Sequence, residues 1–161
     1  MKIELKHLYR STGHSYKGRH GLGALDYKME ECDQFELVAS SGIVGDRYFD
    51  FKPDFKGQIT FFDWAVFEEV RKEFLLPDLC PSSFRRNALI AGVDLNSLIG
   101  KTFSINGVTY SGSEEAAPCY WMNEACADGV HEFLKGKGGL RCRILNDGIL
   151  PLGNSQFSLS E

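Results

Sequence analysis

The segment Thr102-Phe103-Ser104-Ile105-Asn106-Gly107-Val108-Thr109-Tyr110-Ser111 decides the fold class. Asn106 and Gly107 tolerate the positive φ angles of a type I′ turn, so this dipeptide between two strand-like runs is the strongest short-range hairpin signal in the chain. We therefore predict paired strands over residues 102–105 and 108–111. This antiparallel pair makes a mainly β architecture the starting point for the remaining sequence.

Further short runs on both sides of the hairpin are typical of strands. They alternate apolar with polar residues, or they are rich in β-branched and aromatic side chains. These runs cover residues 2–9, 35–39, 57–62, 88–93, 140–145 and 149–159.

One clear helix is predicted directly after the third of these runs. Asp63 is a suitable N-cap, and Trp64, Phe67, Val70 and Phe74 follow it at helical spacing. The intervening residues are mostly charged, so the helix is expected to be amphipathic and to cover one face of the sheet.

Two shorter helices complete the expected secondary structure. Asp94 is predicted to cap a brief helix over residues 95–99, and Asp128 to cap a last one that runs through Leu134. Many short strands with two or three short helices indicate a single domain over residues 1–161. The residue pattern leaves two architectures open, an antiparallel β-barrel or a β-sandwich with helical decoration.

Composition and charge limit the classes of function. The chain has 161 residues with 43% hydrophobic and 25% charged residues, as soluble globular domains do. Its net charge of −4 argues against general nucleic-acid binding. There is no apolar run long enough for a membrane helix and no charged-then-apolar leader, and the five cysteines are an odd number. We therefore expect a cytoplasmic protein with reduced thiols and no membrane partner.

Cys119 is the most informative single residue. Pro118 precedes it, so the thiol is expected on a stiff, non-helical turn. Guanidinium groups could come near it from two segments, Arg85-Arg86 and Arg141-Cys142-Arg143. Nearby positive charge favours the reactive thiolate form of a cysteine. The alternative is that Cys119 is a small buried apolar residue, as most cysteines without a disulfide are.

Several motifs occur together in one order and resemble a known family, the MOSC domain, which is named after the C-terminal domain of molybdenum cofactor sulfurases. The resemblance runs from about Ser11 to the last strand, and five motifs in order are a stronger signal than any one of them. The motifs are Gly42-Ile43-Val44-Gly45-Asp46-Arg47, Arg85-Arg86-Asn87, Gly92-Val93-Asp94-Leu95-Asn96-Ser97-Leu98-Ile99-Gly100, Pro118-Cys119 and Gly136-Lys137-Gly138-Gly139-Leu140-Arg141. The loop around His14 and His20 resembles small stand-alone bacterial members.

The resemblance implies a fold and a set of site residues. The implied fold is mainly β, a single closed barrel of short, mostly antiparallel strands with a cleft. Cys119 matches the family's reactive cysteine, which carries sulfur or touches molybdenum. The matching polar cleft positions are Arg47, Arg85, Arg86, Asn87 and Arg141, and Gly139 would allow close approach of a ligand to the backbone. Many members have a second cysteine where this chain has Ala116, so chemistry that needs two neighbouring thiols is not expected.

The resemblance also implies cofactors and partners. The expected cofactor is the molybdenum cofactor (molybdopterin), whose phosphate suits arginine side chains. If the chain carries sulfur as a Cys119 persulfide, a separate cysteine desulfurase or other donor must supply it, because no pyridoxal-phosphate site is recognisable here. A molybdenum-dependent reductase would instead need an electron-donating partner.

Other interpretations of the same residues stay open. The barrel could be a non-catalytic ligand-binding or interaction module, which Ala116 favours. His14 and His20 could hold zinc for a hydrolase, although no further metal-ligand spacing supports this. Tyr120 and Trp121 could wall the pocket or pack in the core. If Arg85 and Arg86 lie in a strand, only one of them can face the site.

Overall fold

The predicted hairpin forms in the computed structural model, which describes residues 1–13 and 28–160. Strands β7 (Thr102–Ile105) and β8 (Val108–Glu115) pair antiparallel with Ile105 opposite Val108. Asn106 and Gly107 have φ angles of 52° and 80°, as a type I′ turn requires. The hairpin prediction is therefore confirmed.

The hairpin belongs to a closed barrel, which decides between the two predicted architectures. In the described residues the order around the barrel is β11-β7-β8-β9-β5-β6-β1, and β1 pairs with β11 to close it. The pair β5–β6 is parallel and its connection crosses over through a helix, whereas the other barrel pairs are antiparallel. The other barrel strands are β1 (Lys2–Arg10), β5 (Ile59–Asp63), β6 (Ala88–Ala91), β9 (Leu140–Ile144) and β11 (Gly153–Leu159).

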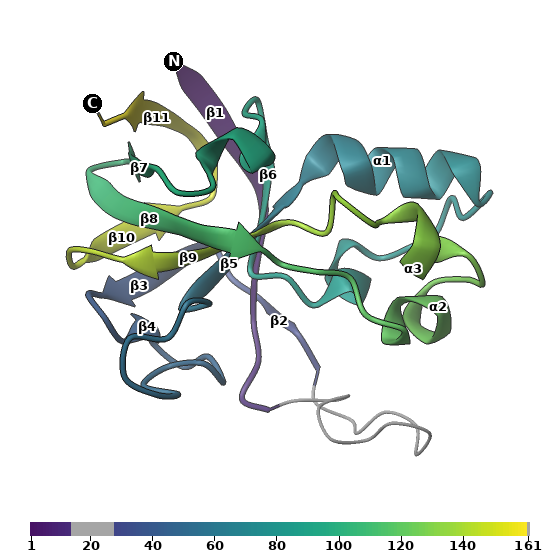
Figure 1. Ribbon diagram of the computed structural model, residues 1–161, viewed down its shortest axis with the longest axis horizontal. Helices are drawn as coiled ribbons and strands as arrows, with labels where there is room; N and C mark the ends of the chain where they lie inside the picture. Colours follow the sequence, from purple (N-terminus) through teal and green to yellow (C-terminus); the bar gives the residue numbers. More distant parts are fainter. Residues whose placement is uncertain (14–27, 161) are drawn as a thin grey trace.

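A smaller sheet and short helices surround the barrel. The sheet has the order β10-β3-β4, and β2 (Glu30–Glu31) pairs with the end of β1. Figure 1 shows the three α-helices together on one side of the barrel and the small sheet on another. The bounds are β3 (Gln34–Val38), β4 (Gly42–Ile43), β10 (Gly148–Pro151), α1 (Trp64–Glu73), α2 (Trp121–Ala125), α3 (Val130–Phe133) and the 3-10 helices η1 (Pro81–Phe84) and η2 (Leu95–Leu98).

Two of the three predicted helix caps form, and the third does not. The Oδ1 of Asp63 accepts a hydrogen bond of 2.9 Å from the amide of Ala65 at the start of α1, and that of Asp94 accepts one of 3.2 Å from Asn96 at η2, so both caps are confirmed. The prediction for Asp128 is wrong, because the N-cap of α3 is Gly129, at a φ of 95°, and no side chain caps this helix. Helix α2 had not been predicted.

Apolar side chains form two cores, and this division positions the site. One core fills the barrel, where Phe61, Phe103 and Tyr110 are in contact. The second lies between the outside of the barrel and the helices, around Phe62 and Phe67. Along β9 the residues Leu140, Cys142 and Ile144 point into the barrel, so Arg141 and Arg143 point outward by strand alternation.

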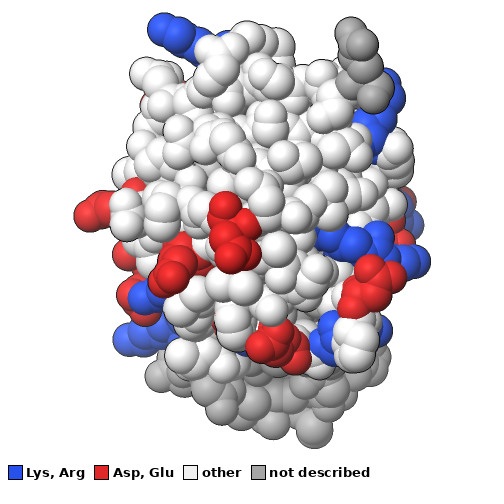
Figure 2. Space-filling view, turned by 90° about the vertical axis from the view of Figure 1, so that its left-hand side faces the viewer, with Lys and Arg blue, Asp and Glu red and all other residues white. Residues whose placement is uncertain are grey.

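Charge is mixed over the part of the surface seen in Figure 2. Acidic and basic side chains lie close to one another in a band across the lower half of this face, without a large patch of one sign. Among the described residues, no helix has both the length and the apolar character needed to cross a membrane.

Candidate functional site

Three outward-facing residues on adjacent strands form one part of a pocket. The register places Arg141 of β9 opposite Thr60 of β5 on one side and opposite Glu114 of β8 on the other. The Nη1 of Arg141 lies 2.7 Å from the Oε1 of Glu114. Gly57 leaves room for this arginine, because a Cβ there would lie 2.7 Å from the Nε of Arg141.

The turn after β4 supplies the second part. The Oδ1 of Asp46 accepts hydrogen bonds of 3.1 Å from the amide of Ser11 and from the Nη1 of Arg47, and its Oδ2 accepts one of 3.2 Å from the amide of Tyr48. Asp46 therefore closes the turn and orients Arg47, whose side chain is 7% exposed. The Nη2 of Arg47 also donates to the carbonyl of Arg85 at 3.1 Å.

Arg85 and Arg86 both line the pocket, so the expectation that only one can face the site is wrong. That expectation assumed a strand, but these residues lie between η1 and β6. Arg85 has the left-handed conformation, with φ 55° and ψ 33°, and ends η1. The side chains therefore do not alternate across a sheet. The Nη2 of Arg85 donates to the carbonyl of Gly13 at 3.0 Å.

The guanidinium of Arg86 joins two segments of backbone. Its Nε donates to the carbonyl of Gly138 at 3.0 Å, and its Nη2 donates to those of Ala116 at 3.0 Å and Ala117 at 3.4 Å. Within the described residues it has no carboxylate partner and its Nη1 makes no hydrogen bond. Burial lowers the pKa of Arg86 to about 10.

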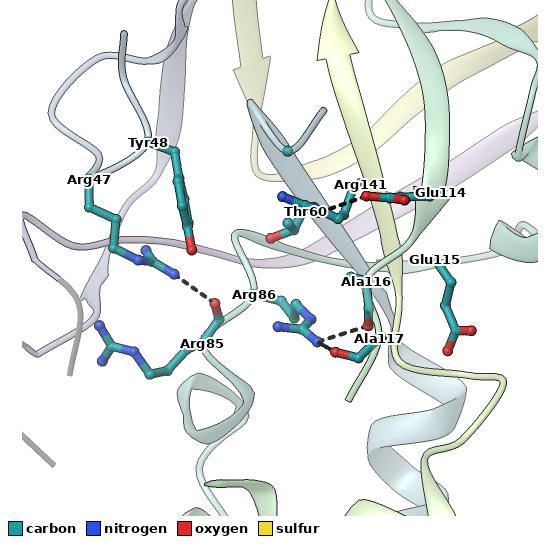
Figure 3. A pocket seen from close by; sticks show the side chains of 11 residues that line it. Arg47, Tyr48, Thr60, Arg85, Arg86, Glu114, Glu115, Ala116, Ala117 and Arg141 are labelled. Atoms are coloured by element: carbon teal, nitrogen blue, oxygen red, sulfur yellow. Dashed lines mark hydrogen bonds and ion pairs between the residues drawn. The ribbon is translucent and has the colours of Figure 1, made fainter. Parts of the chain in front are cut away.

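Together these residues enclose an open pocket of about 330 Å³. Figure 3 shows Arg86 between Arg47, Tyr48 and Arg85 on one side and Ala116 and Ala117 on the other. Four arginines and two glutamates line the pocket, so it carries an excess of positive charge although the chain carries −4. The lining residues are Arg47, Tyr48, Gly57, Thr60, Arg85, Arg86, Glu114, Glu115, Ala116, Ala117 and Arg141.

Cys119 lies beside this pocket rather than on its wall. It is exposed, so the alternative of a buried apolar cysteine is wrong. Ala117, two residues before it, is the last lining residue of this segment, and the carbonyl of Cys119 accepts a hydrogen bond of 3.0 Å from the amide of Met122. Cys119 is therefore an exposed residue that directly follows the segment lining the pocket.

Two predicted site residues lie elsewhere. Asn87 is buried, and its Oδ1 accepts hydrogen bonds from the amide and hydroxyl of Thr60 at 3.0 and 3.1 Å, while its Nδ2 donates to the carbonyl of Tyr9 at 3.1 Å. Gly139 has a φ of 113°, and a Cβ there would lie 2.5 Å from the carbonyl oxygen of Phe61. Both therefore hold strands next to the pocket together rather than line it.

Three other residues that were considered near the site are not part of the pocket lining. Tyr120 is 60% exposed, and neither it nor Trp121 lines the pocket. Arg143 is bound to Asp54 at 2.8 Å and is likewise absent from the lining. Over residues 1–13 and 28–160, no three histidine, cysteine or acidic side chains form a metal-binding group. His14 and His20 lie outside the described residues.

Sequence reasoning missed several lining residues. Tyr48 directly follows the predicted Arg47, so its position could have been inferred from the motif. Thr60 and Glu114 have no motif of their own. They face the pocket because the register puts them beside Arg141, and that register is not readable from the sequence.

Comparisons with known proteins agree with this geometry. The family model described as MOSC domain matches residues 46–155. No curated protein is similar enough to count as a match. Among solved structures, the YUAD protein from Bacillus subtilis is 19% identical with a TM-score of 0.78, over 100% of this chain and 97% of that chain.

Two further solved structures share the fold. YiiM from Geobacillus stearothermophilus is 14% identical with a TM-score of 0.71, over 99% of this chain and 75% of that one. YiiM from Escherichia coli is 16% identical with a TM-score of 0.66, over 100% of this chain and 70% of that one. At these identities the likeness establishes the fold alone.

Proposed function

This chain belongs to the MOSC domain family, and on that premise we propose that its arginine-lined pocket binds the phosphate-bearing molybdenum cofactor with Cys119 beside it. One observation carries the proposal. Arg86 presents a partly desolvated cation to the pocket without a carboxylate partner among the described residues. A partly buried charge is stabilised by an opposite charge beside it, and an anionic ligand would supply one here.

The residues present fit such a cofactor. Arg86 would hold the phosphate together with Arg47 and Arg85, since guanidinium groups bind phosphate through two parallel hydrogen bonds. The volume of about 330 Å³ lies within the usual range for small-molecule sites. The described residues form no metal-binding group of their own, so the metal would have to arrive with most of its ligands.

The remaining contribution of the chain comes from Cys119. A single thiolate is a soft ligand suited to complete the coordination of a metal that is already held by a cofactor. When bound, the cofactor supplies a centre that can exchange electrons and oxygen or sulfur atoms. The exposed position of Cys119 would leave its thiol open to a reactant.

A sulfur carrier is the second candidate, and the exposure of Cys119 outside the pocket wall favours it. In this reaction the thiolate of Cys119 attacks the outer sulfur of a persulfide on a cysteine desulfurase. The bond within that persulfide breaks, the desulfurase recovers its thiolate, and Cys119 becomes the persulfide. No external oxidant or reductant is required.

Metal content tests the first candidate. The chain is produced in a host that makes the molybdenum cofactor, and molybdenum is measured per chain in the wild type and in Arg86→Gln, Cys119→Ala and Cys80→Ala. We expect molybdenum in the wild type and in Cys80→Ala, and a loss of most of it in the other two. Cys80 is the matched control because it is also exposed but is five residues from the nearest lining residue in sequence, whereas Cys119 is two residues from Ala117. Equal molybdenum in all four proteins would contradict binding through Arg86 and Cys119, and none in the wild type would contradict cofactor binding.

Mass spectrometry tests the second candidate. The protein is incubated with a cysteine desulfurase and cysteine, and its peptides are mapped without reduction. A sulfur carrier should gain one sulfur atom, about 32 Da, on Cys119. Equal labelling of Cys80 and Cys119 would instead indicate unspecific transfer and would favour a non-catalytic module.

A further inference from the structure

An aromatic side chain that does not line the pocket contacts two residues that do. The ring of Phe55 stacks on the ring of Tyr48, with 5.2 Å between the ring centroids and 27° between the planes. The guanidinium carbon of Arg141 lies over the ring of Phe55, 5.1 Å from its centroid. Tyr48 and Arg141 line the pocket, whereas Phe55 does not. Phe55 therefore joins two lining residues without itself meeting a ligand in the pocket.

These contacts belong to a series that reaches from one side of the pocket to the other. The guanidinium carbon of Arg47 lies over the ring of Tyr48, 4.9 Å from its centroid. The series thus runs from Arg47 through Tyr48 and Phe55 to Arg141, with a guanidinium at each end. Figure 3 shows Arg47 and Tyr48 on one side of the pocket and Arg141 on the other. Phe55 is the member of the series that connects the two sides.

The segment that carries Phe55 is held against β9. The Nε of Arg143 lies 2.8 Å from the Oδ1 of Asp54, which directly precedes Phe55. A Cβ at Gly57 would lie 2.7 Å from the Nε of Arg141, so the backbone at Gly57 passes close to this arginine. Phe55 itself is only 6% exposed. The ring of Phe55 therefore has a fixed position from which it can hold the guanidinium of Arg141.

Arg141 needs this support because its side chain is long and 30% exposed. An arginine that is free to move loses much conformational entropy when a ligand fixes it. The Oε1 of Glu114 holds the Nη1 of Arg141 at 2.7 Å, and the ring of Phe55 offers its negative face to the same cation. Because the guanidinium is already ordered, a ligand that binds to it pays a smaller entropic cost.

We propose that Phe55 is a positioning residue of the pocket, which fixes the guanidinium of Arg141 for an anionic ligand. This inference rests on the proposed function, because it requires an anion to bind between the arginines. Phe55 acts through Arg141 and does not touch the ligand. A leucine at this position keeps most of the apolar burial but has no ring face for the guanidinium.

Calorimetric titration with inorganic phosphate tests the proposal. We expect Phe55→Leu to weaken phosphate binding about three- to tenfold, as the loss of a partly buried cation–π contact would. Phe55→Tyr keeps the ring face and should retain the affinity of the wild type. The matched control is Phe157→Leu, because Phe157 is also 6% exposed but stacks on Phe103 in the barrel core. It should lower stability and leave phosphate binding unchanged.

A second background separates positioning from a general loss of structure. Arg141→Gln removes the group through which Phe55 acts, so it should weaken phosphate binding by itself. Adding Phe55→Leu to Arg141→Gln should then have little further effect, whereas a merely structural role would lower the affinity by the same factor in both backgrounds. If Phe55→Leu does not fold, Phe55→Met replaces it, because methionine adapts to the same space without a ring.

The outcomes separate this inference from the proposed function. Equal phosphate affinity in the wild type and Phe55→Leu, or the same loss in both backgrounds, would overturn the role of Phe55 and leave the anion site intact. A loss in Phe55→Tyr or Phe157→Leu as large as in Phe55→Leu would overturn it as well. Absence of phosphate binding to the wild type would overturn the anion site itself and this inference with it.

Discussion

The hydroxyl of Tyr110 lies inside the barrel and has no hydrogen-bond partner among the described residues. The residue is fully buried, and its ring contacts Phe61 and Phe103. Desolvation raises the pKa of Tyr110, because the phenolate would be even less stable in this apolar interior. A buried polar group without a partner costs about 1–3 kcal/mol, so the hydroxyl destabilises the fold.

We therefore expect Tyr110→Phe to raise the free energy of unfolding by about 1 kcal/mol, measured by urea denaturation. The matched control is Tyr9→Phe. Tyr9 is also buried, but its hydroxyl lies 3.3 Å from the Nδ1 of His7, so this substitution should lower stability. A loss of stability in both variants would indicate that Tyr110 has a polar partner.

At the scale of elements, two glycines with positive φ angles differ in their surroundings. Gly107 in the β7–β8 turn has a φ of 80°, and no atom lies within 4 Å of the place that a Cβ would take there. Gly139, before β9, has a φ of 113°, and the carbonyl of Phe61 would lie 2.5 Å from its Cβ. An alanine therefore meets backbone strain at the first position, and strain together with a backbone clash at the second.

We expect Gly107→Ala to cost about 1 kcal/mol, the usual penalty for a left-handed non-glycine residue. Gly139→Ala should cost clearly more, since β5 and β9 must separate to admit the methyl group. Thermal unfolding of the two variants beside the wild type measures the difference. The carbonyl of Gly138, the residue before Gly139, accepts a hydrogen bond from Arg86. Gly139→Ala should therefore also weaken phosphate binding, whereas Gly107→Ala should not. Equal stability losses would show that the barrel adapts at Gly139.

The elements also show what the sequence could predict. Asn106-Gly107 and the cap at Asp63 act locally, so the hairpin and α1 were predictable from neighbouring residues alone. Helix α2 has five residues, too few for a helical period to appear, and it follows the proline turn at Pro118. Closure of the barrel depends on the pairing of β1 with β11, which come from opposite ends of the chain, and the residue pattern alone left a sandwich open as well.

The site was predictable to a similar degree and for a similar reason. The family motifs indicated Arg47, Arg85, Arg86 and Arg141, and the structure brings all four to one pocket. The motifs could not indicate that Asn87 and Gly139 contact the neighbouring strands instead of lining the pocket. That distinction depends on which partners the register places beside each residue, such as Thr60 beside Asn87.

For the whole molecule, the distribution of charge makes ligand binding and stability depend on each other. The chain carries −4, and the face in Figure 2 has no large patch of one sign, yet the pocket contains four arginines against two glutamates. These like charges repel one another in the ligand-free protein. An anion that binds only the folded state relieves this repulsion and stabilises the fold by mass action.

Phosphate should therefore raise the melting temperature of the wild type. At about 100 times the Kd the linkage is worth about 2.7 kcal/mol, which corresponds to a shift of about 5–10 °C for a domain of this size. The shift should become smaller when potassium chloride screens the charges in the pocket.

Glu114→Gln removes one acid and releases Arg141 from its ion pair, so it should strengthen phosphate binding severalfold. Glu73→Gln, outside the pocket lining, is the control and should leave the affinity for phosphate unchanged.

Arg86→Gln should lose most of the phosphate-induced shift in melting temperature. If it keeps the full shift, phosphate stabilises the protein through the solvent or at another place, and the desolvated cation of Arg86 is not the group that binds it.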